Sequence, residues 1–227
     1  MTLKTPSIVT LPLLIAAMMT ACASGVFGQG TSLEILRRID ALNSVFHSLR
    51  SEITMIQISG KDQVSKTSVG SMLLQRVKDK SPSLRVEWTS PRESMAMTGQ
   101  KYVRYSPGEK LAVKGAIKDE RQTYLRALLA DFSKKALIAN WFIAYVGDEK
   151  IGNGTMTFHL IFTPKNDTTY KTLDCWIDAN GMPNQVKLAE NNGDTITIML
   201  SRLQSNSPIR KAEFKVKIPR GTKTRKF

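Results

Sequence analysis

The sequence has few of the residues that most enzymes and metal sites use. It contains two cysteines and two histidines in 227 residues. His47 and His159 have no spacing that implies shared ligation, and neither an H-E-x-x-H motif nor a C-x-x-C pair is present. No G-x-S-x-G nucleophile motif occurs either. We therefore expect no catalytic residues, no metal, no cofactor and no enzyme activity.

Long apolar runs are also scarce. The run from Ile8 to Met19 follows Lys4, contains Pro12 and is too short for a transmembrane helix. Small residues come after it, and this order is typical of a secretory signal peptide. We expect a signal peptide over residues 1–28, a single domain over 29–227 and export from the cytoplasm.

The end of the predicted signal peptide leaves two alternatives open. Ala21-Cys22-Ala23 fits an A-x-A cleavage site, and Val26-Phe27-Gly28 fits it more loosely. The stretch Met19-Thr20-Ala21-Cys22 also reads as a degenerate lipobox, in which Cys22 would be lipidated and would anchor the protein to a membrane. In both cases Cys175 has no disulfide partner in the mature chain.

The balance of charge is strongly positive. Lys and Arg outnumber Asp and Glu by 33 to 19, which gives a formal net charge of +14. Such an excess favours an anionic partner: nucleic acid, lipid headgroups or an acidic protein surface. Export from the cytoplasm argues against nucleic acid.

The spacing of apolar residues first predicts a helix and then strands. Thr31 and Glu34 have the spacing of a helix capping box. The apolar stripe that follows consists of Leu33, Leu36, Ile39, Leu42, Phe46 and Leu49. Alternation with a period of two then predicts antiparallel strands over residues 51–60, 68–77, 83–90, 93–99, 101–106 and 110–115.

The second half of the chain repeats this order. A helix is predicted around Tyr124–Phe132, ending near Lys134 and Lys135, and the apolar segment Trp141–Tyr145 is expected to be a second helix or a covering segment. Further strands are predicted over residues 155–163, 172–178, 184–190, 194–203 and 212–219, before a frayed basic tail. The fold class is therefore α+β, an incomplete antiparallel β-barrel with helices against its inner side.

Such a half-barrel would leave a hydrophobic cavity. Methionine is plentiful, with ten residues, and its flexible thioether suits surfaces that accept varied apolar shapes. Glu87 and Glu93 flank Trp88, but strand alternation favours solvated carboxylates over a glycosidase pair. The candidate cavity residues are Met72, Leu74, Leu84, Val86, Trp88, Met95 and Met97 of the sheet, with Leu128 and Phe132 of the predicted helix opposite.

Three stretches resemble the periplasmic outer-membrane lipoprotein carriers (LolA-like proteins). They are GSMLLQRVKDKSPSLRVEWTSP (Gly70–Pro91), LIFTPKN (Leu160–Asn166) and NSPIRKAEFKVKIPRGTKT (Asn206–Thr224). The resemblance implies a half-open barrel closed by α-helices, with the acyl chains of lipoproteins bound between barrel and helices. It also implies an arginine that controls the helical lid, a position filled by Arg76 or, with a different alignment, by Lys80.

The resemblance further implies function and partners. A monomeric carrier would take lipidated proteins from an ATP-driven release complex of the inner membrane and deliver them to a receptor in the outer membrane. The alternative is a lipid-anchored receptor, or an envelope sensor or lipid-binding module of the same fold, which a lipid on Cys22 would favour.

Overall fold

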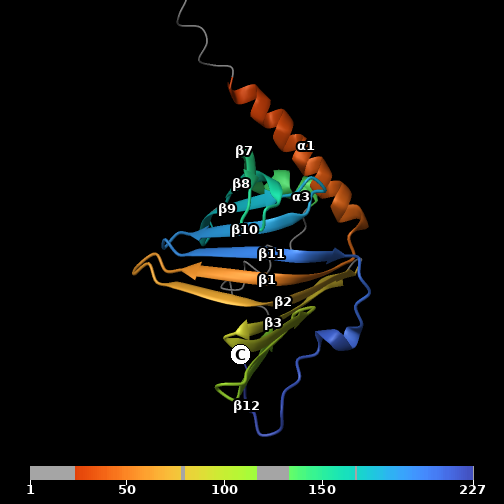
Figure 1. Cartoon of the computed structure of the whole chain (residues 1–227), viewed down its shortest axis with the longest axis vertical. Coiled ribbons are helices and arrows are strands. Elements are labelled where there is room, and N and C mark those ends of the chain that lie inside the picture. Colours follow the sequence, from red (N-terminus) through yellow and green to blue (C-terminus); the bar gives the residue numbers. More distant parts are fainter. Residues whose placement is uncertain (1–23, 78–79, 117–132, 167, 227) are drawn as a thin grey trace, which may run out of the picture.

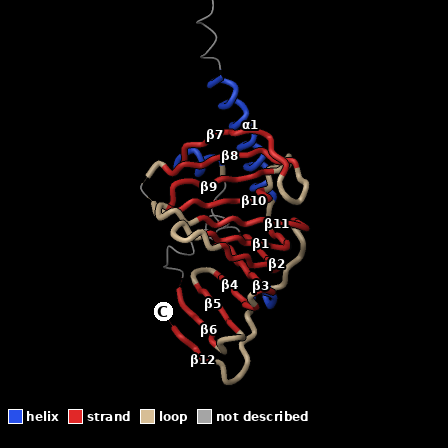
Figure 2. The backbone as a smooth tube through the Cα atoms, turned by 60° about the vertical axis from the view of Figure 1, so that its left-hand side comes forward, coloured by secondary structure: helices blue, strands red, loops and turns tan. Residues whose placement is uncertain are grey.

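One curved sheet dominates the protein. The structure, a computed structural model, describes residues 24–77, 80–116, 133–166 and 168–226. The strands stack in the order β12-β6-β5-β4-β3-β2-β1-β11-β10-β9-β8-β7, and Figures 1 and 2 show them as one continuous ladder. Its two end strands, β12 and β7, do not pair with each other. The predicted open, mostly antiparallel sheet is therefore confirmed, and the sheet is not a closed barrel.

The first six strands agree with the sequence prediction. They are β1 (Ser48–Ile58), β2 (Ser65–Val77), β3 (Lys80–Ser90), β4 (Arg92–Thr98), β5 (Lys101–Ser106) and β6 (Leu111–Ala116). Each pairs antiparallel with the next. The period-two pattern identified them because side chains alternate between the two faces of a strand, as the buried residues of β1 do.

The strands of the second half form another antiparallel series. They are β7 (Trp141–Lys150), β8 (Met156–Pro164), β9 (Tyr170–Ile177), β10 (Pro183–Glu190) and β11 (Thr195–Ser205). The two series are joined at one place, where β1 pairs with β11. The expectation of a helix or covering segment at Trp141–Tyr145 is wrong, because Trp141, Ile143 and Tyr145 alternate with more exposed residues along an edge strand.

The inner face of the sheet is the face that carries Leu49, Met72 and Leu84. Directly paired residues share a face, and Leu49 pairs with Leu74, which pairs with Leu84. In the next row, Met72 pairs with Val86, which pairs with Met95 of β4. These side chains belong to one buried apolar cluster with residues of β8 to β11.

Helix α1 (Ser24–Val45) packs on this inner face (Figure 1). Ile35, Leu36 and Ile39 are buried, whereas the predicted stripe residue Leu33 is 43% exposed. The helix begins at Ser24, so Thr31 and Glu34 lie inside it and cannot form a capping box at its start. It ends at Val45, which places the predicted helical residue Leu49 on β1.

The second helical region is described only in part. The predicted helix Tyr124–Phe132 lies outside the described residues. Helix α3 (Lys134–Asn140) is capped by the Ser133 side chain, which accepts a hydrogen bond from the Ala136 amide. Lys134 and Lys135 therefore begin a helix rather than end one, because Ser133 is the stronger terminus signal. Closure of the inner face by a second long helix remains a prediction.

The chain after β11 crosses the outer face of the sheet, opposite α1. Arg85 donates hydrogen bonds to the carbonyl oxygens of Glu213 and Lys215, at 2.7 and 3.1 Å. Arg50 forms a 2.8 Å ion pair with the Glu213 carboxylate. A hydrogen bond from the Arg210 backbone amide, and then that from Arg50, lower the pKa of Glu213 to about 2.

This segment corrects two predictions. The predicted strand at 212–219 is instead the 3₁₀ turn η2 (Lys211–Phe214) and an irregular stretch, because side chains rather than a strand bind its carbonyls. The tail expected to fray forms β12 (Lys223–Lys226), which pairs in parallel with β6 (Figure 2).

Gly181 fixes the distance between α1 and the sheet. It lies in the β9–β10 turn with φ +86°, a conformation that favours glycine. A Cβ atom built there would lie 2.5 Å from the carbonyl carbon of Arg38 in α1. The Arg38 guanidinium also donates a hydrogen bond to the Ala179 carbonyl oxygen of this turn, at 3.2 Å.

We therefore predict that Gly181→Ala lowers the free energy of unfolding by about 3 kcal/mol, since backbone strain and a steric clash with α1 add together. Gly154→Ala is the matched control. It has nearly the same φ, +87°, but only the Lys150 side chain near it, at 3.8 Å, and it should cost about 1 kcal/mol. Urea denaturation of both variants measures the difference, and equal losses would contradict a contact between Gly181 and α1.

Candidate functional site

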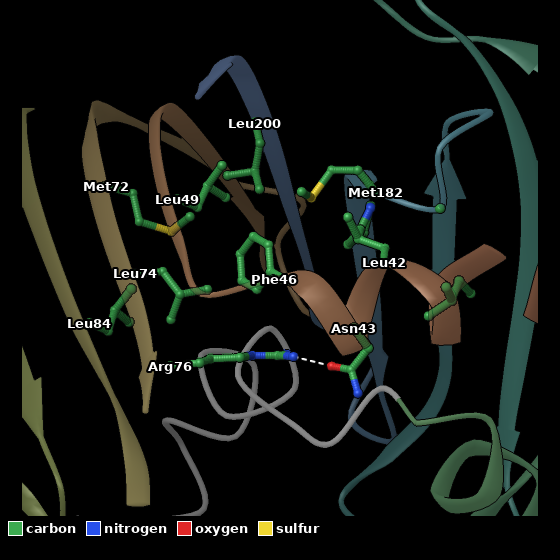
Figure 3. A pocket seen from close by; sticks show the side chains of 13 residues that line it. Leu42, Asn43, Phe46, Leu49, Met72, Leu74, Arg76, Leu84, Met182 and Leu200 are labelled. Carbon is green, nitrogen blue, oxygen red and sulfur yellow. Dashed lines mark hydrogen bonds between the residues drawn. The ribbon is translucent and has the colours of Figure 1, made fainter. Parts of the chain in front are cut away.

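An apolar cavity lies between α1 and the inner face of the sheet (Figure 3). The helix side consists of Ile39, Leu42 and Asn43 of α1, together with Phe46, the residue that directly follows the helix. The strand side consists of Leu49, Met72, Leu74, Arg76, Leu84 and Leu200, and the β9–β10 turn contributes Gly181, Met182 and Pro183. Except for Asn43 and Arg76, every side chain that lines it is apolar.

The predicted sheet residues divide between this cavity and its surroundings. Met72, Leu74 and Leu84 line it, as does the predicted lid residue Arg76. Val86 and Met97 lie on the same face but do not line it. Trp88 and Met95 line a second hollow farther along that face, whereas Leu128 and Phe132 lie outside the described residues.

The sequence prediction missed the other lining residues for two reasons. Leu42 and Phe46 were assigned to the buried stripe of the helix, and that stripe gives no sign of where packing is incomplete. Met182 and Leu200 come from the second series of strands, and no local pattern shows that β11 pairs with β1. The alternation of β11 does predict that Leu200 is buried, but not what it faces.

Arg76 stands at the polar rim of the cavity. Its guanidinium donates a hydrogen bond to the side-chain oxygen of Asn43 in α1 (Figure 3). It also lies 5.3 Å from the centre of the Phe46 ring, within the range of a cation–π contact. The Arg76 backbone amide donates to the His47 carbonyl oxygen at 2.8 Å. The contacts of Arg76 therefore connect β2 to the C-terminal end of α1.

The cavity is small as it stands, with a volume of about 50 Å³. On this measure a cavity needs about 10–15 Å³ to hold one water molecule, so the space corresponds to only a few water-sized groups. A long alkyl chain fits only if α1 and the side chains beneath it move away from the sheet. Two of those side chains, Met72 and Met182, are methionines, which adopt new shapes easily.

The other candidates for chemistry do not assemble into an active site. The His159 Nε2 atom lies 3.0 Å from the Asp174 carboxylate, and its ring stacks on Trp176 with centroids 4.3 Å apart. Cys175 lies on the opposite face, because it is adjacent to Trp176 along the strand. Burial, and then the neighbouring Asp174 charge, raise the pKa of the Cys175 thiol, which disfavours the reactive thiolate.

Glu87 and Glu93 likewise point to opposite faces, since Glu93 pairs with Trp88. Glu87 accepts a hydrogen bond from Arg85, and Glu93 accepts one from Ser106. Among the described residues, no group of three or more His, Cys, Asp or Glu side chains is placed to hold a metal ion. Within the same part of the chain, no helix is long and apolar enough to cross a membrane.

The sequence and the fold both match known proteins. Residues 56–217 match the family described as outer membrane lipoprotein carrier protein LolA, and no curated protein matches. The structure of MucB is similar, with a TM-score of 0.54 and 13% identity, over 83% of this chain and 63% of that chain. An uncharacterized conserved protein of Thermus thermophilus also has a TM-score of 0.54, with 11% identity over 87% of this chain and 99% of its own.

The lipoprotein LppX of Mycobacterium tuberculosis has a TM-score of 0.48 and 12% identity, over 80% of this chain and 98% of its own. The likeness to MucB and to the Thermus thermophilus protein shows a shared fold and nothing about ligands. The family match covers well over half of the chain, including β2, β3 and β11, which supply most of the strand side of the cavity. This chain therefore belongs to the outer membrane lipoprotein carrier protein (LolA) family.

Proposed function

We propose that the protein is a non-enzymatic carrier that binds the acyl chains of lipoproteins between α1 and the inner face of the sheet. It would carry them through the periplasm from the inner to the outer membrane. The observation that supports this most is the apolar cavity beneath α1 in a member of this family. Acyl chains need such shelter, since each methylene exposed to water costs about 0.8 kcal/mol.

Loading would require α1 to separate from the sheet. The polar contacts that hold the helix include Arg38 with Ala179, Asn43 with Arg76, the Asp40 carboxylate with the Lys134 backbone amide at 3.0 Å, and the Asn206 side-chain amide with the Val45 carbonyl oxygen at 3.0 Å. Each is worth roughly 1 kcal/mol. Incoming methylenes would replace the apolar contacts that α1 gives up, so the exchange would be nearly balanced and reversible, as a carrier requires.

Arg76 is our candidate for the residue that controls this movement. It is the cationic side chain that lines the cavity, and it contacts α1 directly. The side chain of its rival, Lys80, lies outside the described residues. Arg76 would favour the closed state when the cavity is empty and would release α1 when cargo enters.

The remaining parts of the proposal concern the ends of the pathway. A signal peptide over residues 1–28 would direct export, and residues 29–227 would form the carrier domain. The donor would be an ATP-driven release complex and the acceptor an outer-membrane receptor, both meeting a monomer. The positive charge of the chain, +14, would assist contact with acidic surfaces of these partners.

A second candidate is a receptor, sensor or lipid-binding module anchored through Cys22. The degenerate lipobox at residues 19–22 favours it. The mature N-terminus distinguishes the two functions: mass spectrometry should find an unlipidated start after Ala23 or Gly28 for a carrier. A diacylated or triacylated Cys22 would support the anchored alternative.

The direct test is to isolate the protein from its native periplasm and identify what it holds. We expect lipidated proteins to copurify with it and to be released by mild detergent. Recovery of free lipid alone, with no lipoprotein, would overturn the carrier function in favour of the lipid-binding alternative.

We predict that Asn43→Ala loosens α1. Loss of the Arg76 hydrogen bond should speed amide hydrogen exchange in residues 33–45 by about three- to tenfold. Alanine is the better helix former, so a purely local effect would slow exchange instead. Ser44→Ala is the matched control, because the Ser44 hydroxyl bonds only within the helix, to the Ala41 carbonyl oxygen. Equally slow amide hydrogen exchange in Asn43→Ala and Ser44→Ala would contradict the proposal that Arg76 holds α1.

We also predict that Leu42→Trp fills the cavity and weakens binding of a fluorescent fatty acid by about tenfold, since the larger side chain overpacks a closed space. Leu33→Trp makes the same change on the same helix at an exposed position outside the cavity, and should bind normally. Equilibrium fluorescence titration measures both. Equal affinity of the two variants would place the acyl chain elsewhere.

A further inference from the structure

The inner face of the sheet changes from apolar to polar along its length. On β2 the residues of this face are, in order, Lys66, Ser68, Gly70, Met72 and Leu74. The ends of β1 match those of β2, because register places Gln57 beside Lys66 and Leu49 beside Leu74, while Met55, Ile53 and Ser51 lie between them. The apolar end lies under α1, and the polar end lies at the β1–β2 hairpin.

A second hollow occupies the polar end, with a volume of about 240 Å³. Lys66 and Ser68 border it on one side and Arg104 of β5 on the other. Arg104 forms a 3.5 Å ion pair with Glu93, and Glu93 also accepts a hydrogen bond from Ser106. With two cations and one carboxylate at its walls, the hollow carries a net positive charge.

Both hollows lie on the inner face of the sheet. Met72 lines the first and Ser68 the second, and they are four residues apart on β2. At about 3.3 Å per residue, this separation is roughly 13 Å. Ile53 and Val86 lie between the two hollows and are 1% and 0% exposed. A single amphiphilic molecule can therefore extend from one hollow to the other along the strand only after these side chains are uncovered.

We propose that the polar hollow is a subsite for a phosphate-bearing lipid headgroup, with Lys66 and Arg104 as its cationic ligands, and that the alkyl chain of the same lipid lies under α1. This inference rests on the acyl cavity of the proposed function, and its ligand is a free phospholipid, because the diacylglyceryl group of a lipoprotein carries no phosphate. Glu93 orients Arg104 across the hollow and leaves guanidinium N–H groups for an anion. A neutral sugar is the less favoured occupant, because Trp88 and Tyr102 are nearly buried and offer little ring surface for stacking.

The test compares two lipids that share an acyl chain and a glycerol unit: lysophosphatidylglycerol and the corresponding monoacylglycerol. Binding of both to the full chain is measured by calorimetry at low salt. We expect the anionic lipid to bind about tenfold more tightly. Lys66→Gln should reduce this preference about threefold, since Lys66 is exposed, and Arg104→Gln should nearly abolish it.

Lys171→Gln is the matched control, because this substitution removes the same charge. Lys171 is exposed on β9 and does not line either hollow. It should leave the preference unchanged. If Arg104→Gln does not fold, Lys66→Glu tests the same subsite from an exposed position and should remove most of the preference.

The outcomes separate this inference from the proposed function. Equal binding of the two lipids would overturn the headgroup subsite and leave the acyl cavity intact. Binding of neither lipid would overturn the acyl cavity as well. Inorganic phosphate that binds alone as tightly as the lysolipid would show a site for the free anion rather than for a headgroup, and would also overturn the inference.

Discussion

The packing of α1 on the inner face is the contact on which the rest of the structure depends. Ile35, Leu36 and Ile39 are almost fully buried there, so the helix completes a core that the sheet cannot complete by itself. The same helix covers the cavity beneath Leu42 and Phe46. Stability and access therefore compete for one interface, and a mutation that tightens it would favour the empty protein.

The contacts of α1 differ between its middle and its C-terminal end, so stability and access depend on different parts of the helix. Near its middle, the backbone of Arg38 lies against Gly181 with no room for a Cβ atom. At its C-terminal end, the contact with the sheet is made by long or polar side chains, Asn43 with Arg76 and Phe46 with Arg76. The middle is thus a fixed point, whereas the end beside the cavity is held by contacts that can be exchanged for others. Methionines beneath it accept the change in shape.

The sequence was most informative where one physical rule acts locally. Alternation gave β1 to β6 and β8 to β11 nearly to their ends and made Met72, Leu74 and Leu84 candidates for the cavity, whereas Arg76 came from the resemblance. It failed where tertiary contacts decide. Trp141–Tyr145 has the apolar content of a helix, yet it forms an edge strand. Residues 212–219 have the alternation of a strand, yet Arg85 binds the backbone of this segment in place of a neighbouring strand.

Which residues surround the cavity was not predictable in the same way. Leu49 and Leu200 both line it, from strands whose pairing joins positions about 150 residues apart in the chain. Hydrophobic patterns predict that Leu49 and Leu200 are both buried, but not that they line the same cavity. Gaps in packing depend on the sizes of side chains that face one another, and these are known only when the partners are known.

The pairing of β1 with β11 has a consequence for how the protein matures. Most other strands pair with their neighbours in the chain and close quickly as hairpins, whereas this junction, like the pairing of β12 with β6, must wait for the late part of the chain and costs more loop entropy. Leu74 and Leu84 lie on one side of the junction and Met182 lies on the other. The cavity therefore exists only after this long-range pairing has formed. A chain in which β11 has not yet paired with β1 therefore lacks the two opposed sides of this cavity.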